Sequence, residues 1–346
     1  MRTETGEEFD MASGIESEYW TDVSPDGRSI AYQSNSSVQA DLLAGNSSVI
    51  IKSPTNQFPP LSVKGINPRW LPDNRRIAFQ RREETGQRSY LWVIDSVNGE
   101  ERQITKNIVR APGYSLLPYN QNQTREYSWS PDSSKVAYLN SESGIQNILA
   151  TSPESNDTVN FTDNNNPNVW YYCPLYSPDG KRIAFVSQQR QDAKEKDFIW
   201  KIWVIEQGQS KEIYSGSASL RLLGWSADGG LVLEKSEVPM AANPLDITLL
   251  RLSATGLKQF ETVFKQIYVT SMSLSTDGKK VVFTARQDNK DNICVASTKS
   301  GELKRMTNNS NSKLFYGSPA LSPDGSTIFF DKQEETSIIS RLENFN

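Results

Sequence analysis

Short apolar runs separated by one recurring polar turn make up most of the chain. The clearest copy lies at residues 175–186 and reads Leu-Tyr-Ser-Pro-Asp-Gly-Lys-Arg-Ile-Ala-Phe-Val. Its Ser177-Pro178-Asp179-Gly180 segment is typical of a tight turn. Proline presets φ, the aspartate bonds nearby N–H groups, and glycine adopts the left-handed conformation without a Cβ clash. The apolar run that follows predicts a buried strand, so the unit predicts a β-hairpin.

Six further copies of this unit occur, and all seven keep the aspartate of the turn. The seven aspartates are Asp26, Asp73, Asp132, Asp179, Asp228, Asp277 and Asp324, and successive ones are 47 to 59 residues apart. Asn74 is a tolerable replacement for the glycine because asparagine enters the left-handed region, whereas Ser133 is expected to strain or reshape its turn. This period with several short strands per unit is typical of a β-propeller blade, and no long helical stripe competes with it.

The repeat unit resembles that of the TolB-like β-propeller family. In that pattern the Ser-Pro-Asp-Gly turn and the Ile-Ala-Phe run lead to a strand such as 202–205 (Ile-Trp-Val-Ile). A closing segment follows, such as 102–105 (Arg-Gln-Ile-Thr) or 304–307 (Lys-Arg-Met-Thr). The resemblance covers nearly the whole chain and implies the fold. It leaves the function open, because such propellers act as binding scaffolds, as sensor halves of membrane regulators and kinases, and as gates on peptidases.

We therefore predict an all-β, seven-bladed β-propeller of four-stranded antiparallel blades, forming one domain over residues 1–346. The blades are expected to start near residues 20, 65, 127, 172, 219, 268 and 315. Residues 6–13 match in phase residues 301–308, the outer strand of a blade, and the last repeat stops after a third strand at 337–342. Residues 1–14 are therefore expected to supply the outer strand of the last blade and to close the ring, which removes two free sheet edges.

Charge and composition narrow the classes of partner. The chain has 37 basic and 41 acidic residues, a formal net charge of −4, and no basic stripe, which argues against nucleic-acid binding. No apolar run approaches the ~18 residues of a membrane span, and no signal-peptide core is visible at the start. Cys173 and Cys294 are expected to be free, because a whole blade should separate them.

Aromatic residues and arginines gather where each repeat leads into the next. We call these connections, from the outer strand of one blade to the first strand of the next, the crossover loops. They are expected to converge on one face, opposite the Ser-Pro-Asp-Gly turns, and residues 107–127 form a longer insertion there. The predicted ligand-binding residues are Trp20, Tyr114, Tyr119, Arg125, Trp170, Tyr172, Arg221, Tyr268 and Tyr316. Such side chains are typical of recognition surfaces. The alternative is that single aromatic residues wedge between blades.

The complete absence of histidine bounds the chemistry. It excludes a Ser-His-Asp triad and imidazole metal ligation within the chain, so no catalytic residue, metal or cofactor is predicted and the chain is interpreted as a non-enzyme. The first hypothesis is a binding, sensor or scaffold propeller that recognises a protein segment or a small molecule at the mouth of the central channel. The resemblance implies a periplasmic or otherwise extracytoplasmic location, as the sensor part of a bacterial membrane-anchored regulator.

Two alternatives stay open. The second hypothesis is a carbohydrate-active enzyme with paired carboxylates in the central channel. The third is the gating propeller of a serine peptidase, which requires a hydrolase domain that these residues do not contain.

Overall fold

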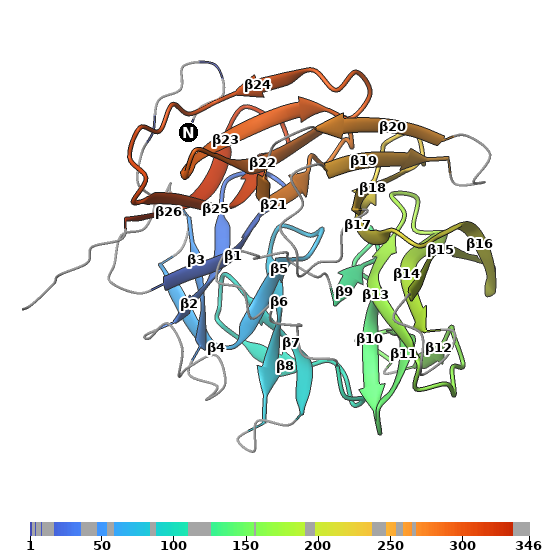
Figure 1. The fold of residues 1–346 in the computed structure, drawn as a ribbon. Helices are drawn as coiled ribbons and strands as arrows, with labels where there is room; N and C mark the ends of the chain where they lie inside the picture. The colour runs from blue at the N-terminus through green and yellow to red at the C-terminus, as the bar shows by residue number, and fades with distance from the viewer. Residues whose placement is uncertain are drawn as a thin grey trace, which may run out of the picture.

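Antiparallel sheets stand side by side around a common centre in the computed structural model (Figure 1). The structure describes residues 1, 4, 8, 17–35, 47–53, 59–83, 88–109, 126–155, 157–190, 198–236, 247–253, 259–264 and 268–334. Within these ranges six sheets have four strands each, and a last sheet has two. In every four-stranded sheet the strands pair in chain order, so each is a simple meander, here called a blade.

The first three blades occupy the N-terminal half of the chain. Blade 1 contains β1 (Ser17–Val23), β2 (Ile30–Asn35), β3 (Ser47–Lys52) and β4 (Leu61–Lys64). Blade 2 contains β5 (Ile66–Trp70), β6 (Arg76–Arg82), β7 (Ser89–Asp95) and β8 (Glu101–Gln103). Blade 3 contains β9 (Tyr127–Trp129), β10 (Val136–Glu142), β11 (Ile145–Thr151) and β12 (Thr158–Asn160).

Three further blades and the two-stranded sheet follow. Blade 4 contains β13 (Val169–Tyr176), β14 (Arg182–Arg190), β15 (Phe198–Glu206) and β16 (Gln209–Gly216). Blade 5 contains β17 (Ser219–Trp225), β18 (Leu231–Ser236), β19 (Ile247–Leu252) and β20 (Gln259–Phe264). Blade 6 contains β21 (Tyr268–Leu274), β22 (Lys280–Gln287), β23 (Lys290–Ser297) and β24 (Leu303–Arg305). The last sheet contains β25 (Leu314–Leu321) and β26 (Ile328–Glu334).

The prediction of seven four-stranded blades is wrong for the described part of the chain, in which six blades have four strands. The physical reason is that the repeated turn marks only the junction between the first two strands of a sheet. It therefore carries no information on whether a third and a fourth strand follow. The third strand expected at 337–342 lies outside the described residues.

The N-terminus lies against the two-stranded sheet, but not as the predicted outer strand. Met1 is buried and exchanges two backbone hydrogen bonds of 2.8 Å with Ile328 in β26. Since Ile328 pairs with Leu321 of β25 on its other side, Met1 lies where a third strand would lie, not a fourth. Most of residues 1–14, which were expected to form that strand, lie outside the described residues.

The last sheet packs against the first blade. β25 lies next to β1, and the Thr21 hydroxyl donates a hydrogen bond of 3.2 Å to the Asp331 carboxylate. A Cβ built on Gly27 in the first turn would lie 3.2 Å from Pro323 in the last turn. The first blade and the last sheet are therefore in contact both through their strands and through their turns.

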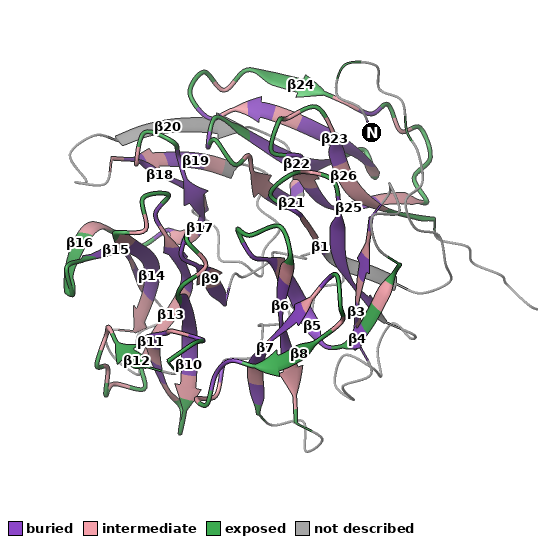
Figure 2. Cartoon of the chain, turned by 180° about the vertical axis from the view of Figure 1, so that it is seen from behind, coloured by how far each residue is buried: buried purple, intermediate pink, exposed green. Residues whose placement is uncertain are grey.

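The core lies between neighbouring blades, where apolar faces of adjacent sheets meet. The largest such cluster joins blades 4 and 5 and includes Val186, Trp200, Ile202, Leu220 and Leu222. The outer strands β8, β12 and β24 are exposed along their whole length (Figure 2). Both cysteines are free, as predicted, and are buried in this core.

The repeated turn has the predicted geometry in all seven copies. Its last residue has a positive φ throughout, including 60° at Asn74 and 59° at Ser133. Ser133 therefore does not reshape its turn, and its N–H still donates to the Ser130 carbonyl at 2.9 Å. In the six turns that begin with serine, the serine hydroxyl donates to the aspartate carboxylate, for example at 2.6 Å from Ser130 to Asp132.

These turns also set the charge of their aspartates and the spacing of neighbouring blades. The hydroxyl of Ser130 and the N–H of Ser134 hold the pKa of Asp132 at about 2. Around the centre of the ring, the turn of blade 6 sits directly on that of blade 5, since a Cβ on Gly278 would lie 2.3 Å from the Cα of Ser226. The N–H of Ala227 donates to the Asp277 carbonyl at the same contact.

Candidate recognition site on the crossover face

The predicted binding residues fall into described and undescribed groups. Tyr114, Tyr119 and Arg125 lie outside the described residues, and the side chain of Trp20 in β1 is not described. The other five lie on first strands, namely Trp170 and Tyr172 on β13, Arg221 on β17, Tyr268 on β21 and Tyr316 on β25. Each first strand ends at a copy of the repeated turn. The residues at the beginning of a first strand therefore lie on the opposite side of the ring, here called the crossover face.

Trp170 belongs to a half-buried group of three side chains from blade 4. Phe198, at the start of β15, meets Trp170 edge to face with ring centroids 6.1 Å apart. The Arg190 guanidinium lies over the Phe198 ring, 5.0 Å from its centroid. Strand pairing explains the grouping, because Arg190 pairs with Phe198 and Trp170 pairs with Gln188 two residues away. We call Trp170, Arg190 and Phe198 the aromatic–arginine cluster.

Tyr172 lies on the same face of blade 4 but packs as part of the core. Its ring stacks on Trp200 at 5.8 Å, and its hydroxyl donates to the Gln188 side chain at 2.7 Å. Trp200 in turn packs against Leu220 and Leu222 of blade 5. The wedge alternative therefore describes Tyr172, while the cluster continues this inter-blade core to the surface.

Tyr268 and Tyr316 lie at a second group, where blade 6 meets the two-stranded sheet. The Arg286 guanidinium lies 4.9 Å from the centroid of Phe315 and is held by Asp291 through bonds of 2.6 and 3.1 Å. Tyr268 pairs with Arg286 across the strands, and burial raises the pKa of its hydroxyl. Tyr316 is only 6% exposed and belongs to an apolar cluster with Val282 and Ile293 of blade 6, so it also acts as a wedge.

Arg221 is occupied within its own blade. Its guanidinium forms a two-pronged ion pair with Glu234, and the two side chains are only 11% and 13% exposed. Because successive residues of a strand point to opposite faces, Arg221 lies on the face away from Leu220 and Leu222, and so away from blade 4. The structure thus groups Trp170 with Tyr172, and Tyr268 with Tyr316, but does not bring Arg221 to either group.

Sequence analysis missed Arg190, Phe198, Arg286 and Asp291. These residues lie on second and third strands, at the ends farthest from the turn motif, where the repeat pattern is silent. The available signal was an arginine near the end of two apolar second strands, at residues 190 and 286. Its aromatic neighbour becomes visible only when strand pairing is known.

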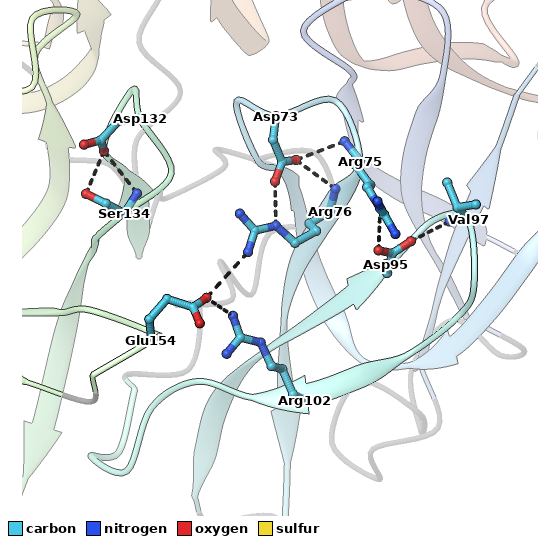
Figure 3. A network of polar contacts seen from close by, with 9 residues as sticks. All are labelled: Asp73, Arg75, Arg76, Asp95, Val97, Arg102, Asp132, Ser134 and Glu154. Carbon is cyan, nitrogen blue, oxygen red and sulfur yellow. Dashed lines mark hydrogen bonds and ion pairs between the residues drawn. The ribbon is translucent and has the colours of Figure 1, made fainter.

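The opposite face carries a network of ion pairs between blades 2 and 3 (Figure 3). Glu154 accepts from the Arg102 guanidinium at 2.6 Å and lies 4.0 Å from that of Arg76. Asp73 binds the same Arg76 at 2.5 Å, so the cations there already have anionic partners. This network joins blades 2 and 3, and each arginine in it already has a carboxylate partner.

Other kinds of site find little support among the described residues. No group of three or more acidic or cysteine side chains is arranged to hold a metal ion there. A cavity lined by Gly65, Ile66 and Gln80 is only large enough for water. Within the same residues, no helix is long and apolar enough to cross a membrane.

The sequence was also compared with known protein families and proteins. Residues 120–345 match the family model described as the TolB beta propeller domain. The chain belongs to this family. The TolB-type propeller is 25% identical over 208 residues to an uncharacterized peptidase of Bacillus subtilis, YuxL, and the match covers 58% of this chain and 28% of the relative. It therefore spans less than a third of that relative's length.

Solved structures similar to this TolB-type propeller share its fold. The β-propeller domain of the Trilobed protease from Pyrococcus furiosus aligns with a TM-score of 0.62 and 15% identity, over 96% of this chain and all of that one. TolB from Acinetobacter baumannii aligns with a TM-score of 0.51 and 20% identity, over 81% and 66%. Acylaminoacyl peptidase from Pyrococcus horikoshii aligns with a TM-score of 0.60 and 12% identity, over 94% and 52%.

These findings overturn the interpretation of the chain as a non-enzyme. The relative from B. subtilis is named a peptidase, and so are structures that the propeller covers only in part. The histidine argument was correct for a triad within these 346 residues. It was wrong as a statement about enzymes, because a propeller can belong to a protein whose catalytic groups lie elsewhere.

Proposed function

We propose that this TolB-type propeller recognises extended polypeptide at its crossover face, as the recognition part of a peptidase. The observation that carries the proposal is the aromatic–arginine cluster, where Trp170 and Phe198 remain half-buried at the edge of an inter-blade core. Exposed aromatic surface next to a guanidinium binds peptide side chains well, because it buries much area while few rotamers are lost.

Amide groups around the cluster support a peptide ligand over other ligands. Gln189 is half-buried and Asn168 is exposed, and the Asn168 carbonyl accepts the Arg190 N–H at 3.3 Å. Side-chain amides both donate and accept, which suits the alternating N–H and C=O groups of an extended backbone. An apolar surface with amides at its rim is the composition of an interface with polypeptide.

The link to a peptidase rests on the relative from B. subtilis, of which this chain matches a minor part. In this proposal the propeller selects or holds polypeptide, while cleavage occurs on groups outside these residues. An extracytoplasmic site of action in a bacterium is also proposed, and it rests on the family alone.

The recognition half is tested with a labelled unfolded protein, reduced and carboxymethylated α-lactalbumin, by fluorescence anisotropy. Trp170→Ala should weaken binding roughly tenfold, the usual cost of removing a central aromatic anchor. Val97→Ala is the matched control, since Val97 is 66% exposed in a turn on the opposite face. Equal affinity of wild type and Trp170→Ala, with both folded by circular dichroism, would contradict the proposal.

The peptidase half needs a separate experiment. The protein is captured with an antibody from the cells that make it, and the captured material is treated with a serine-reactive fluorophosphonate probe. Labelling of a polypeptide that contains or accompanies the chain is expected. Absence of any labelled polypeptide would remove the peptidase from the proposal and leave recognition to the binding assay.

A further inference from the structure

The two aromatic groups on the crossover face differ in how their arginine is neutralised. At β25, Arg286 beside Phe315 is paired with Asp291, whose side chain is only 2% exposed. In blade 4 the third-strand residue that pairs with the arginine is Phe198, whereas in blade 6 it is Asp291. An uncharged aromatic ring therefore lies beside Arg190, where a carboxylate lies beside Arg286.

Arg190 keeps its charge available at this site. Among the described residues it has no ion-pair partner, and its Nε has no hydrogen-bond acceptor. Residues 191–197, which follow it, are outside the described ranges. Phe198 lies against the guanidinium plane, which fixes the group while leaving its edge N–H groups for a ligand.

A second cation lies on the facing side of the same inter-blade junction. Lys235, near the end of β18, pairs with Leu220, which belongs to the core shared with blade 4. Lys235 therefore occupies the face of blade 5 that meets blade 4, at the crossover end. Two basic side chains therefore lie at this junction, although the chain as a whole has a net charge of −4.

We propose that the aromatic–arginine cluster binds a peptide carboxylate, with Arg190 holding the carboxylate and the neighbouring apolar side chain of the peptide packing on Trp170 and Phe198. This inference rests on the proposed function and specifies its ligand. A planar guanidinium matches the two oxygens of a carboxylate, and such charge-assisted bonds are about twice as strong as neutral ones. The carboxylate is either the C-terminus of the peptide or an acidic side chain, and the peptides below separate these sources.

The test uses three acetylated peptides and isothermal titration calorimetry. The first is Ac-Gly-Ala-Gly-Ala-Phe with a free C-terminus, the second is its C-terminal amide, and the third is the amide Ac-Gly-Ala-Glu-Phe-Ala. Wild type should bind the first peptide roughly tenfold more tightly than the second, the value of one charge-assisted contact. The third peptide should match the first if a side-chain carboxylate suffices, and the second if a C-terminus is required.

Variants assign the effect to the cluster. Arg190→Gln should remove the difference between acid and amide, and Arg190→Lys should restore only part of it because the planar fork is lost. Trp170→Ala should weaken both peptides alike. Arg28→Gln, an exposed arginine on the opposite face, is the matched control and should keep the full difference.

The possible outcomes distinguish the carboxylate inference from the proposal of polypeptide recognition. If wild type binds acid and amide equally and Trp170→Ala weakens both, the carboxylate inference fails while polypeptide recognition stands. A difference that survives in folded Arg190→Gln also overturns the inference. If inorganic phosphate displaces the peptides at concentrations where acetate has no effect, the site prefers phosphate and the inference fails. No binding of any peptide overturns both proposals.

Discussion

Two crossovers, from blade 3 into β13 and from blade 6 into β25, use similar asparagine-rich loops but hold the incoming strand with different side chains. In both loops a threonine hydroxyl accepts an isoleucine N–H, at 3.0 Å for Thr162 and 2.9 Å for Thr307. In both, an asparagine side chain of the third strand accepts a loop N–H, at 2.6 Å for Asn147 and 2.8 Å for Asn292. The loops are therefore equivalent in geometry.

The difference lies in the group that holds the incoming first strand. Gln146 accepts the Tyr171 N–H at one crossover, and Asp291 accepts the Tyr316 N–H at 3.2 Å at the other. A buried carboxylate costs free energy unless a cation accompanies it, and Arg286 supplies that cation. The comparison teaches that the same backbone contact can be made by an amide alone or by a complete ion pair. A substitution in the ion pair should lower the free energy of unfolding more than a substitution of the amide.

Arg286→Gln should produce the largest effect. It leaves Asp291 buried without its cation, which should lower the free energy of unfolding by about 3–5 kcal/mol in urea titrations. Ser141→Ala, at the corresponding position of the other crossover, should stay within roughly 0.5 kcal/mol of wild type.

The double variant Arg286→Ser, Asp291→Gln reproduces the arrangement of the other crossover and sharpens this test. It should recover most of the lost stability, because no charge remains buried. A double variant as unstable as Arg286→Gln would mean that the ion pair does not explain the difference between the crossovers.

Gln146→Ala should have an intermediate effect. It removes the acceptor of the Tyr171 N–H but leaves no charge uncompensated, so a loss of about 1–2 kcal/mol is expected in the same titrations. Gln189→Ala is the matched control, because Gln189 makes no side-chain hydrogen bond to any described residue. A loss of stability for Gln146→Ala as large as that for Arg286→Gln would contradict the expected difference between the amide and the buried ion pair.

The smallest effect is expected from pH, and it should not distinguish the two regions. The Ser130 and Ser322 hydroxyls lower the pKa values of Asp132 in blade 3 and Asp324 in the last sheet. A carboxyl with a lowered folded pKa contributes stability above its unfolded value, near 4, and loses it as the pH falls toward 2. Urea midpoints should drop over this window, and Asp132→Asn and Asp324→Asn should each reduce the drop by a similar small amount. A reduction in only one of them would contradict the equivalence of the turns.

Local turn chemistry could be predicted from the sequence, because each turn is encoded by adjacent residues. The serine, the aspartate and the left-handed last position are all present in the motif, and even Asn74 follows the rule. Ser133 showed that the motif tolerates more than propensity suggests. The hydrogen bonds of the other turn residues hold the backbone in place there.

The strand count and the candidate site could not be predicted in the same way. The number of strands in the last sheet depends on segments distant from its turn, as the contact between Met1 and Ile328 illustrates. Arg190 and Phe198 face each other only through the pairing of two strands whose connection carries no motif. Trp170 was predicted to bind a ligand because it is aromatic, but the sequence pattern could not show whether its side chain would be covered, like that of Tyr316, or half-buried.

The close contact at Gly278 has a consequence for engineering. Since a Cβ there would meet the main chain of Ser226 and not a movable side chain, the separation of these two turns is limited by backbone thickness. Substituting alanine at this one position would act as a spacer inserted at the hub, pushing blades 5 and 6 apart without altering any residue of their apolar interface. Substitution of Gly278 thus offers a way to vary the width of the central channel while the residues of the crossover face stay unchanged.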